Sequence, residues 1–222
     1  MPKRENISMS VIRRLPRYYR SLLHLQKEGV MRISSTELSR ELGLTASQIR
    51  QDLNCFGGFG QQGYGYMVGP LAQEIGHILG VSHQYPTVLF GAGNLGRAIA
   101  ARMEFEALGF SLLGFFDNAP QKIGTVIRGL EVRDVATFRA FYEQKHPVMA
   151  ILCTPRTAVE GILDVLYPLG VRNYWNFTHY DISKRYPDTV VENVHLNDSL
   201  LTHSFQIHNP PEPEKKNDKK EK

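Results

Sequence analysis

Hydrophobic residues recur at helical spacing near the start of the chain. Several of them lie three or four residues apart, as on one face of an α-helix: Val11, Leu15, Tyr18, Leu22 and Leu25. Ser8 precedes them and is of a residue type that caps helices. Pro16 lies inside the pattern and lacks a backbone N–H, so we expect the helix to kink or restart there.

Two shorter helices follow, each opened by a capping signal. Residues 34–37, Ser-Ser-Thr-Glu, resemble a capping box and open a helix through about Leu42, which Gly43 ends. Residues 45–48, Thr-Ala-Ser-Gln, repeat the signal and open a helix through Leu53. Two short helices joined by a glycine-containing turn are typical of the helix-turn-helix motif.

The second of these helices is the candidate reader of DNA bases. If Ile49 and Leu53 point inward, the polar residues between them point outward, because residues four apart share a helix face. The outward residues are Ser47, Gln48, Arg50 and Gln51. Arginine and glutamine side chains form paired hydrogen bonds with purine edges in the major groove. The first helical segment adds three further candidate DNA contacts: Arg14, Arg17 and Tyr18.

A glycine-punctuated aromatic segment, residues 56–66, comes directly after the reading helix, where the wing of a winged helix belongs. Its tip, Gln61, Gln62 and Gly63, is narrow and polar enough to enter a minor groove. The alternative is a hairpin that only packs against the helices. Residues 1–82 are therefore predicted to form a winged helix-turn-helix DNA-binding domain.

The next segment predicts a dinucleotide-binding unit. Residues 86–90 form a short buried-strand candidate, and a helix through Ile99, Met103 and Leu108 is expected further on. Between them stands a G-x-G-x-x-G loop: Gly91, Ala92, Gly93, Asn94, Leu95 and Gly96. The three glycines allow a tight turn, close approach of backbone to a pyrophosphate, and close helix–strand packing. The phosphates are then expected at the helix N-terminus.

An acidic residue stands at the position that this motif requires. A second strand, residues 111–116, ends in Asp117, which lies 21 residues after Gly96 (117 − 96). Such a carboxylate accepts hydrogen bonds from an adenosine ribose. It also repels a 2′-phosphate, so the sequence favours NAD(H) over NADP(H).

Two further buried strands are expected at residues 148–153 and 174–178, and alternating strands and helices predict an α/β Rossmann domain over residues 83–192. Residues at the carboxyl ends of the strands line the ligand crevice of such a sheet. Thr154, Pro155, Asn176 and Phe177 are therefore candidate cofactor contacts, although each is equally typical of a simple strand-to-loop position.

The excess positive charge is confined to the predicted DNA-binding domain. Residues 1–80 contain ten Lys or Arg and six Asp or Glu, an excess of four that equals the net charge of the whole chain, +4. This asymmetry indicates a polyanionic partner. No apolar stretch approaches the ~20 residues that span a bilayer, and neither a signal peptide nor metal-ligand spacing around the two cysteines is apparent. We expect a cytoplasmic protein with no metal and no membrane contact.

Five motifs together resemble the Rex family of redox-sensing transcriptional repressors: RRLPRYYRSLLHL, SSTELSRELGLTASQIRQDLNCFGGFGQQGYGY, GAGNLGRAIA, GFFDNAPQKIG and WNFT. The resemblance covers roughly residues 6–208. It implies a homodimer that binds a palindromic operator when NADH is low and releases it when NADH binds. It also implies that the terminal helix, within residues 193–208, swaps onto the partner. The apolar positions Leu196, Leu200, Leu201 and Phe205 need such a surface.

The resemblance also implies three switch positions, and two of them depart from the family pattern. Arg20 keeps the arginine of the first helix. Arg102 stands where many members have a tyrosine, and His195 stands where they have an aspartate. We expect this chain to couple NADH binding to DNA release more weakly than its relatives do.

Two other functions are compatible with parts of the pattern. A Rossmann regulator could bind coenzyme A or another nucleotide, but Asp117 favours a free ribose diol. An NAD-dependent dehydrogenase needs a proton donor beside the nicotinamide, and His146, His179 and His195 stand in no catalytic pattern. We therefore predict a regulator and not an enzyme, with a disordered polar tail over residues 209–222.

Overall fold

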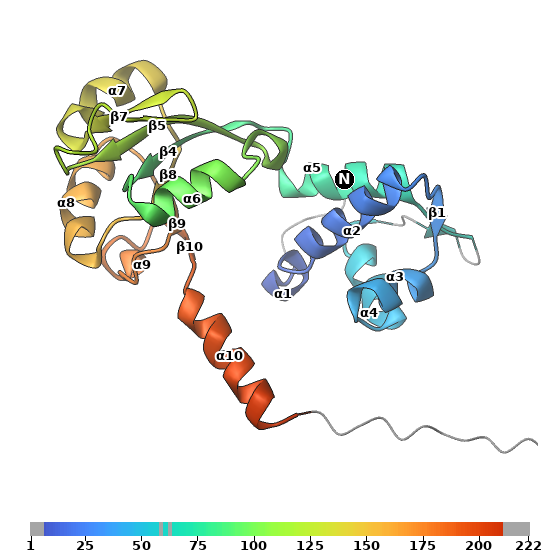
Figure 1. The fold of residues 1–222 in the computed structure, drawn as a ribbon. Helices are drawn as coiled ribbons and strands as arrows, with labels where there is room; N and C mark the ends of the chain where they lie inside the picture. The colour runs from blue at the N-terminus through green and yellow to red at the C-terminus, as the bar shows by residue number, and fades with distance from the viewer. Residues whose placement is uncertain (1–6, 58–59, 62–63, 211–222) are drawn as a thin grey trace, which may run out of the picture. The chain divides into compact units, whose positions relative to one another are not determined.

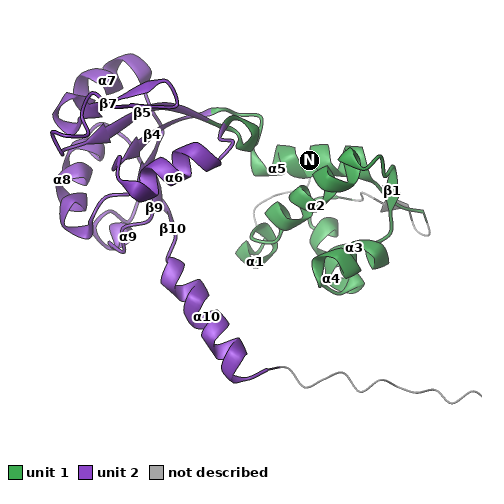
Figure 2. Ribbon diagram, in the orientation of Figure 1, with its two compact units in different colours: residues 1–84, 106–110 green, residues 85–105, 111–222 purple. Residues whose placement is uncertain are grey.

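The computed structural model describes residues 7–57, 60–61 and 64–210. The chain divides into two compact units, shown in green and purple in Figure 2. Unit 1 comprises residues 1–84 and 106–110, and unit 2 comprises residues 85–105 and 111–222. The segment 106–110 therefore belongs with the amino-terminal unit, although it lies inside the predicted Rossmann region of the sequence.

Unit 1 consists of short helices and a small antiparallel sheet (Figure 1). The helices are α1 (Met9–Ile12), α2 (Leu15–Lys27), α3 (Ser35–Leu42), α4 (Ala46–Asn54) and α5 (Val68–Leu79). The strands β1 (Arg32–Ile33), β2 (Gly60–Gln61) and β3 (Gly65–Met67) pair in the order β1-β3-β2. Helices α3 and α4 form the predicted helix-turn-helix, and β2 and β3 form the predicted hairpin after it.

The capping residues act as predicted. Ser8 accepts a hydrogen bond from the Ser10 N–H, and the helix restarts at Leu15 with proline in its first turn. Ser34 accepts from the Glu37 N–H while the Glu37 carboxylate accepts from the Ser34 N–H, which completes the capping box. Thr45 accepts from the Gln48 N–H at 3.1 Å. Each cap satisfies an amide that the helix itself leaves unpaired.

Helix α5 has no counterpart in the prediction, because it contains Gly69, Pro70 and Gly76, which are poor helix formers. Pro70 lies in the first turn, where its missing N–H costs nothing. A Cβ at Gly76 would lie 3.0 Å from the Tyr19 ring, so the glycine allows α5 to approach α2 closely. The core of unit 1 is formed by fully buried residues that include Leu15, Leu22, Leu38, Ile49 and Ile75.

Unit 2 is a Rossmann-type sheet with the strand order β10-β9-β8-β4-β5-β7-β6. Its strands are β4 (Tyr85–Phe90), β5 (Phe110–Asp117), β6 (Val126–Ile127), β7 (Leu130–Asp134), β8 (Met149–Leu152), β9 (Asn173–Asn176) and β10 (Val190–Asn193). The pairs β4–β8, β8–β9, β9–β10 and β5–β7 are parallel, and β6 pairs antiparallel with β7. From β4, the chain continues to β5 on one side and later returns to β8 on the other. The carboxyl ends of β4 and β8 therefore mark the topological switch point.

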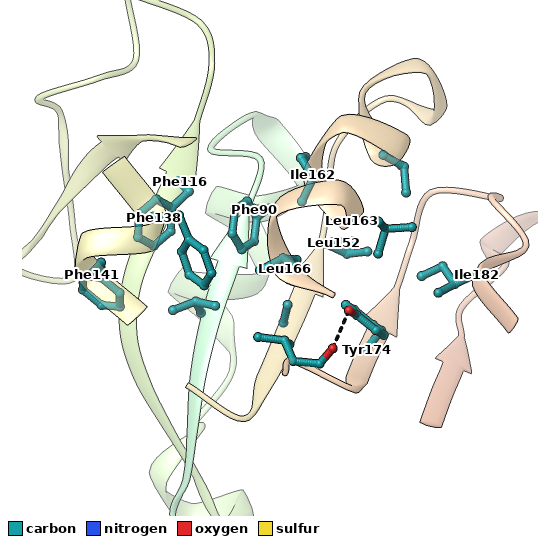
Figure 3. Packing of buried hydrophobic residues seen from close by; sticks show 14 residues of the cluster. Phe90, Phe116, Phe138, Phe141, Leu152, Ile162, Leu163, Leu166, Tyr174 and Ile182 are labelled. Atoms are coloured by element: carbon teal, nitrogen blue, oxygen red, sulfur yellow. Dashed lines mark hydrogen bonds between the residues drawn. The ribbon is translucent and has the colours of Figure 1, made fainter. Parts of the chain in front are cut away.

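Helices α6 (Asn94–Arg102), α7 (Phe138–Lys145) and α8 (Arg156–Leu166) cover the sheet, with α7 and α8 on one face and α6 on the other (Figure 1). Phe138 of α7 packs against Phe90 of β4 and Phe116 of β5, and the three ring centroids lie 5.0–5.2 Å apart (Figure 3). The Tyr174 hydroxyl in the same core donates to the Val171 carbonyl at 2.7 Å, the dashed line in Figure 3. Such aromatic packing fixes the strand ends that carry the site.

Several boundaries differ from the prediction. Helix α6 ends at Arg102 and not near Leu108, because Met103 is extended and residues 106–108 form a separate 3-10 turn. Strands β6, β7 and β10 and the helices α7 and α9 (Ile182–Arg185) were not predicted; these elements are short or follow no clear apolar period. Helix α10 (Leu196–His208) forms near the carboxyl end, as predicted. Residues 211–222, most of the predicted tail, lie outside the described residues.

Candidate functional site

The glycine loop has the backbone geometry that its motif requires. Gly91 has φ +99°, and a Cβ there would lie 2.5 Å from the Cys153 carbonyl oxygen. A Cβ at Gly96 would overlap the Gly91 carbonyl oxygen, so only glycine lets α6 pack against the loop. Gly93 is the N-cap of α6, and no side chain caps that end. The first turn of α6 therefore keeps backbone N–H groups that an anion can accept from.

Asp117 lies at the carboxyl end of β5 and is 5% exposed. Its carboxylate accepts hydrogen bonds from the Ala92 N–H at 2.7 Å, the Ala119 N–H at 2.9 Å and Lys122 Nζ at 3.0 Å. Burial opposes the charged form, but these three donors outweigh it and hold the pKa of Asp117 below its ordinary value. Asp117 is therefore an ionised acceptor at neutral pH.

A cavity of about 630 Å³ lies between the glycine loop, Asp117 and the end of β8. Its lining includes Gly91, Gly93, Asp117, Lys122, Thr154 and Pro155. Thr154 Oγ1 is buried and has no hydrogen-bond partner among the described residues, so a polar group is expected from a ligand. Burial raises the pKa of the Cys153 thiol at the same wall to about 12, which keeps it neutral. Glycine loop, buried acid and unpartnered hydroxyl together fit a dinucleotide.

Asn176 and Phe177 do not line this cavity. We correct the prediction of Asn176 as a ligand contact, and that of Phe177, which is half-buried, stays a prediction. Asn176 is fully buried, and its amide donates to the Tyr180 carbonyl at 2.9 Å and to Asn193 Oδ1 at 2.7 Å. Its own oxygen accepts from the Thr178 hydroxyl and N–H. The Phe177 ring packs edge-on against Trp175. Asn176 therefore ties β9 to β10, a role that depends on a strand the sequence did not reveal.

The structure adds Lys122, a residue that the sequence analysis missed. Within the glycine loop, it also distinguishes a residue that binds Asp117 through its backbone from residues that begin α6. Ala92 acts through its backbone on Asp117, and Asn94 and Leu95 form the first residues of α6. Lys122 reaches Asp117 from the turn that follows β5. No periodicity predicts such a contact, and only its nearness in sequence to Asp117 could have suggested it.

Helix α4 presents a polar face that matches the predicted reader. Ser47, Arg50 and Gln51 are exposed, Gln48 is half-buried, and Ile49 is fully buried. Asn54 is also exposed and stands four residues after Arg50, so helical spacing could have added it to the reading face. Arg50 Nη1 donates to the Ser35 hydroxyl of α3 at 2.9 Å.

All three candidate DNA contacts on the first helical segment make hydrogen bonds inside unit 1, and they differ in exposure. Tyr18 has no exposed surface, and its hydroxyl donates to Asp52 Oδ2 at 2.5 Å, so its prediction as a DNA contact was wrong. Arg14 donates to both oxygens of Asp52, at 2.6 and 2.7 Å. Arg17 is exposed, although its Nη2 also donates to the Leu42 carbonyl. This face of α2 is turned toward α3 and α4.

The hairpin has the form of a wing. Gly60 and Gln61 of β2 pair antiparallel with Tyr66 and Gly65 of β3. The tip residues Gln62 and Gly63, and the side chain of Gln61, lie outside the described part of the structure. Tyr64 beside the tip is 69% exposed.

The three switch positions are all accessible or partly accessible. Arg20 on α2 and Arg102 at the end of α6 are exposed. His195 is the N-cap of α10, and its ring stacks on His179 with centroids 4.6 Å apart. His195 Nδ1 is buried without a partner among the described residues. The roles of these positions remain predictions.

Within the described residues, no three His, Cys, Asp or Glu side chains are grouped as they would be to hold a metal ion. None of the described helices combines the length and the apolar character that crossing a membrane requires.

Known proteins resemble this chain over both units. Residues 6–54 match a family described as a putative DNA-binding protein N-terminus, and residues 82–180 match one described as a CoA binding domain. The redox-sensing transcriptional repressor Rex of Clostridium botulinum (strain Hall) is 48% identical, over 91% of this chain and 96% of its own length. The Clostridium acetobutylicum protein of the same name is also 48% identical, over 91% of this chain and 94% of its own.

Solved structures of a Rex-family repressor, RSP, are also similar to this chain. RSP in complex with β-NAD⁺ and operator DNA has a TM-score of 0.84 and 50% identity, and the match covers 91% of this chain and 93% of that one. RSP in complex with β-NADH has a TM-score of 0.82 and 47% identity, with 91% and 94% covered. RSP is described as a Rex-family repressor. These matches confirm the predicted α/β fold with an amino-terminal DNA-binding domain. The relatives are named transcriptional repressors, in agreement with the prediction that this chain is a regulator. The chain belongs to the Rex family of redox-sensing transcriptional repressors.

Proposed function

We propose that this cytoplasmic protein represses transcription by binding palindromic operator DNA when NADH is scarce and releasing the DNA when NADH binds. One observation carries the proposal. A single chain contains both an exposed polar reading face on α4 and a cavity whose buried acid and unpartnered Thr154 hydroxyl fit a dinucleotide. A sensor that couples a metabolite to DNA requires these two sites together.

In the ligand site, different groups of the chain bind different parts of the dinucleotide. Gly91, Gly93 and the N-terminus of α6 hold the pyrophosphate, because backbone N–H groups and the helix dipole favour an anion there. Asp117 accepts from the adenosine ribose, and Thr154 offers its hydroxyl. When bound, the nicotinamide supplies the redox signal, since its charge and shape differ between NAD⁺ and NADH.

On the DNA side, α4 enters the major groove with Ser47, Arg50 and Gln51, and the hairpin approaches the neighbouring minor groove with the segment Gln61–Gly63. The solved relative RSP has been captured with operator DNA. Arg17 is exposed on the adjoining helix and joins the interface as a phosphate contact.

The protein acts as a homodimer through α10. Leu200, Leu201 and Phe205 are 67–69% exposed in the single chain, and no residue of α10 is buried. Water does not favour such an apolar face, so a second copy is proposed to cover it by a helix swap. Two-fold symmetry of the dimer then matches two half-sites of a palindrome. We propose the domains 1–82, 83–192 and 193–208 for DNA binding, dinucleotide binding and the swap.

Coenzyme A is the second candidate ligand, because residues 82–180 match a family described as a CoA binding domain. Its adenosine ribose carries a 3′-phosphate, and an ionised Asp117 in the ribose position repels a phosphate. The chain therefore fits NAD(H) better.

The test measures how each candidate ligand changes the affinity of the protein for DNA. The palindromic duplex that the purified protein enriches from a random-sequence pool is labelled, and its affinity is measured by fluorescence anisotropy with saturating NADH, NAD⁺ or coenzyme A. We expect NADH to weaken DNA binding most. Equal effects of all three ligands, or an effect of coenzyme A alone, would contradict the proposal.

A further inference from the structure

Asp52 is a buried acidic residue on the helix that is proposed to meet a polyanion. It lies on α4 between the exposed Gln51 and the buried Leu53, and it is 3% exposed. A carboxylate is costly to bury unless it is paired and hydrogen-bonded. An acidic side chain so close to a DNA-reading face needs a compensating role.

The described partners of Asp52 are Tyr18 of α2 and Arg14, the N-cap residue of α2, and both are distant from it in sequence. Arg14 Nε donates to Asp52 Oδ2 at 2.6 Å and Arg14 Nη2 donates to Oδ1 at 2.7 Å, a paired geometry that fixes direction as well as distance. The Tyr18 hydroxyl donates to Oδ2 at 2.5 Å. Burial opposes the charge, but the bonds from Arg14 and Tyr18 keep the pKa of Asp52 below its ordinary value.

Other polar contacts join α2 to α3. Arg17 Nη2 donates to the Leu42 carbonyl at the end of α3, at 2.7 Å, and the Ser21 hydroxyl donates to Glu41 at 2.6 Å. One side of α2 therefore holds the end of α3 through Arg17 and Ser21, and holds α4 through Arg14 and Tyr18.

Apolar packing alone does not set the rotation of α4. Ile49 and Leu53 are its buried apolar residues, and four-residue spacing places them along a single line of the helix. Nonpolar contacts along one line leave the helix free to roll by small angles, because such contacts are not directional. The Arg14–Asp52 pair adds a directional constraint off that line, and it sits beside Gln51 of the reading face.

We infer that Asp52 is a positioning residue, which sets the orientation of the reading helix α4 through its bonds to Arg14 and Tyr18 and thereby determines the sequence specificity of DNA binding. The inference rests on the proposed DNA-binding function of α4. It assigns Arg14 and Tyr18 to the support of the interface, where they touch no DNA.

The test compares a selected duplex with a scrambled one. The selected duplex is the sequence that wild-type protein enriches from a random pool, and affinities are measured by anisotropy for Asp52→Asn, Tyr18→Phe and wild type, at a temperature where circular dichroism shows each to be folded. The matched control is Asp188→Asn, because Asp188 also accepts from an arginine (Arg172, 3.0 Å) and a tyrosine hydroxyl (Tyr167, 2.8 Å), but on unit 2.

For Asp52→Asn, we expect the affinity for the selected duplex to fall about tenfold or more, while the affinity for the scrambled duplex, which depends on phosphates, stays within about threefold. Tyr18→Phe removes one hydroxyl and should cause a loss of about threefold for the selected duplex alone. Asp188→Asn should change neither affinity. A role in stability alone would not change the ratio of the two affinities in folded protein.

Three results would overturn the inference: a folded Asp52→Asn that keeps wild-type specificity, equal losses on both duplexes, or an equal effect of the control. If Asp52→Asn does not fold, Tyr18→Phe decides the question by the same ratio. A wild-type protein that enriches no sequence at all would instead remove the proposed function, and this inference with it.

Discussion

The backbone N–H of Ala92 donates a hydrogen bond to Asp117 Oδ2 at 2.7 Å and so joins the glycine loop after β4 to the end of β5. The two features that define the dinucleotide motif, separated widely in sequence, are thus one hydrogen-bonded unit before any ligand arrives. Ligand affinity and the local structure of the loop therefore depend on the same carboxylate. Lys122 Nζ completes this unit at 3.0 Å.

Replacing Asp117 by asparagine should weaken NADH binding by about tenfold, since a charge-assisted hydrogen bond to the ribose is roughly twice as strong as a neutral one. It should also weaken NADPH binding less than NADH binding, because the repulsion of the 2′-phosphate is lost. Tryptophan-to-NADH energy transfer or NADH fluorescence measures both affinities. An unchanged NADH/NADPH ratio would exclude Asp117 from the ribose position.

The same carboxylate predicts a pH dependence of stability. Its folded pKa is depressed, so its stabilising contribution is present above the unfolded pKa of about 3.9 and is lost as the pH falls through the folded value. Urea unfolding followed at pH 6 and pH 3 should therefore show a difference in free energy between wild type and Asp117→Asn that shrinks at pH 3. A difference that grows with acidity would contradict the depressed pKa.

Gly93→Val should abolish NADH binding and leave DNA binding intact. A Cβ at Gly93 meets no atom nearer than Lys122 Nζ, at 3.8 Å, so the protein itself tolerates a side chain there while a pyrophosphate does not. Gly93→Ala serves as the graded control and should cause a smaller loss. Isothermal titration calorimetry gives the NADH affinities. An affinity of Gly93→Val within threefold of wild type would contradict the assignment of Gly93 to the pyrophosphate site.

Arg50→Ala should cost roughly 1–3 kcal/mol of operator binding if Arg50 meets a base edge, and should relax preference at one operator position. If Arg50 touches only phosphate, binding should weaken equally on all sequences and the salt slope should fall by about one. Lys145→Ala, a charge-matched change on α7 of unit 2, is the control. Unchanged affinity and slope together would remove Arg50 from the interface.

Arg102 and His195 predict weak redox coupling, because a ligand shifts an equilibrium only by its differential affinity for two states. Restoring the family pattern with Arg102→Tyr and His195→Asp should enlarge the effect of NADH on operator affinity and change NADH affinity little. Operator titrations with and without saturating NADH compare wild type and the double variant. A wild type that already releases DNA more than a hundredfold would show that other contacts carry the switch.

Leu200→Glu on α10 should dissociate the proposed dimer, because it places a charge on the apolar face that the second copy covers. Sedimentation velocity should then report a monomer, and operator affinity should fall because two half-sites are no longer held together. Thr202→Glu adds the same charge on another side of the same helix and should leave the dimer intact. A dimeric Leu200→Glu would move the interface elsewhere.

The short-range features could be predicted because their partners are close in the chain. Ser34 and Glu37 cap each other across three residues, and Thr45 binds the Gln48 N–H in the same way. The glycine loop is equally local: Gly96 must be glycine because the Gly91 carbonyl lies against it. The sequence by itself therefore determined the helix-turn-helix, the hairpin, the dinucleotide loop and the family.

The tertiary structure alone decided which polar residues face a ligand and which are tied to one another. Tyr18 is 34 residues from Asp52 in sequence, and Asn176 is 17 residues from Asn193, so no local pattern indicates either hydrogen bond. A polar side chain on a helix or strand end is open to a ligand only when no distant segment supplies its partner. That choice depends on how α2 packs against α4 and on where β10 joins the sheet, because burial forces polar groups to find partners wherever the packed chain provides them.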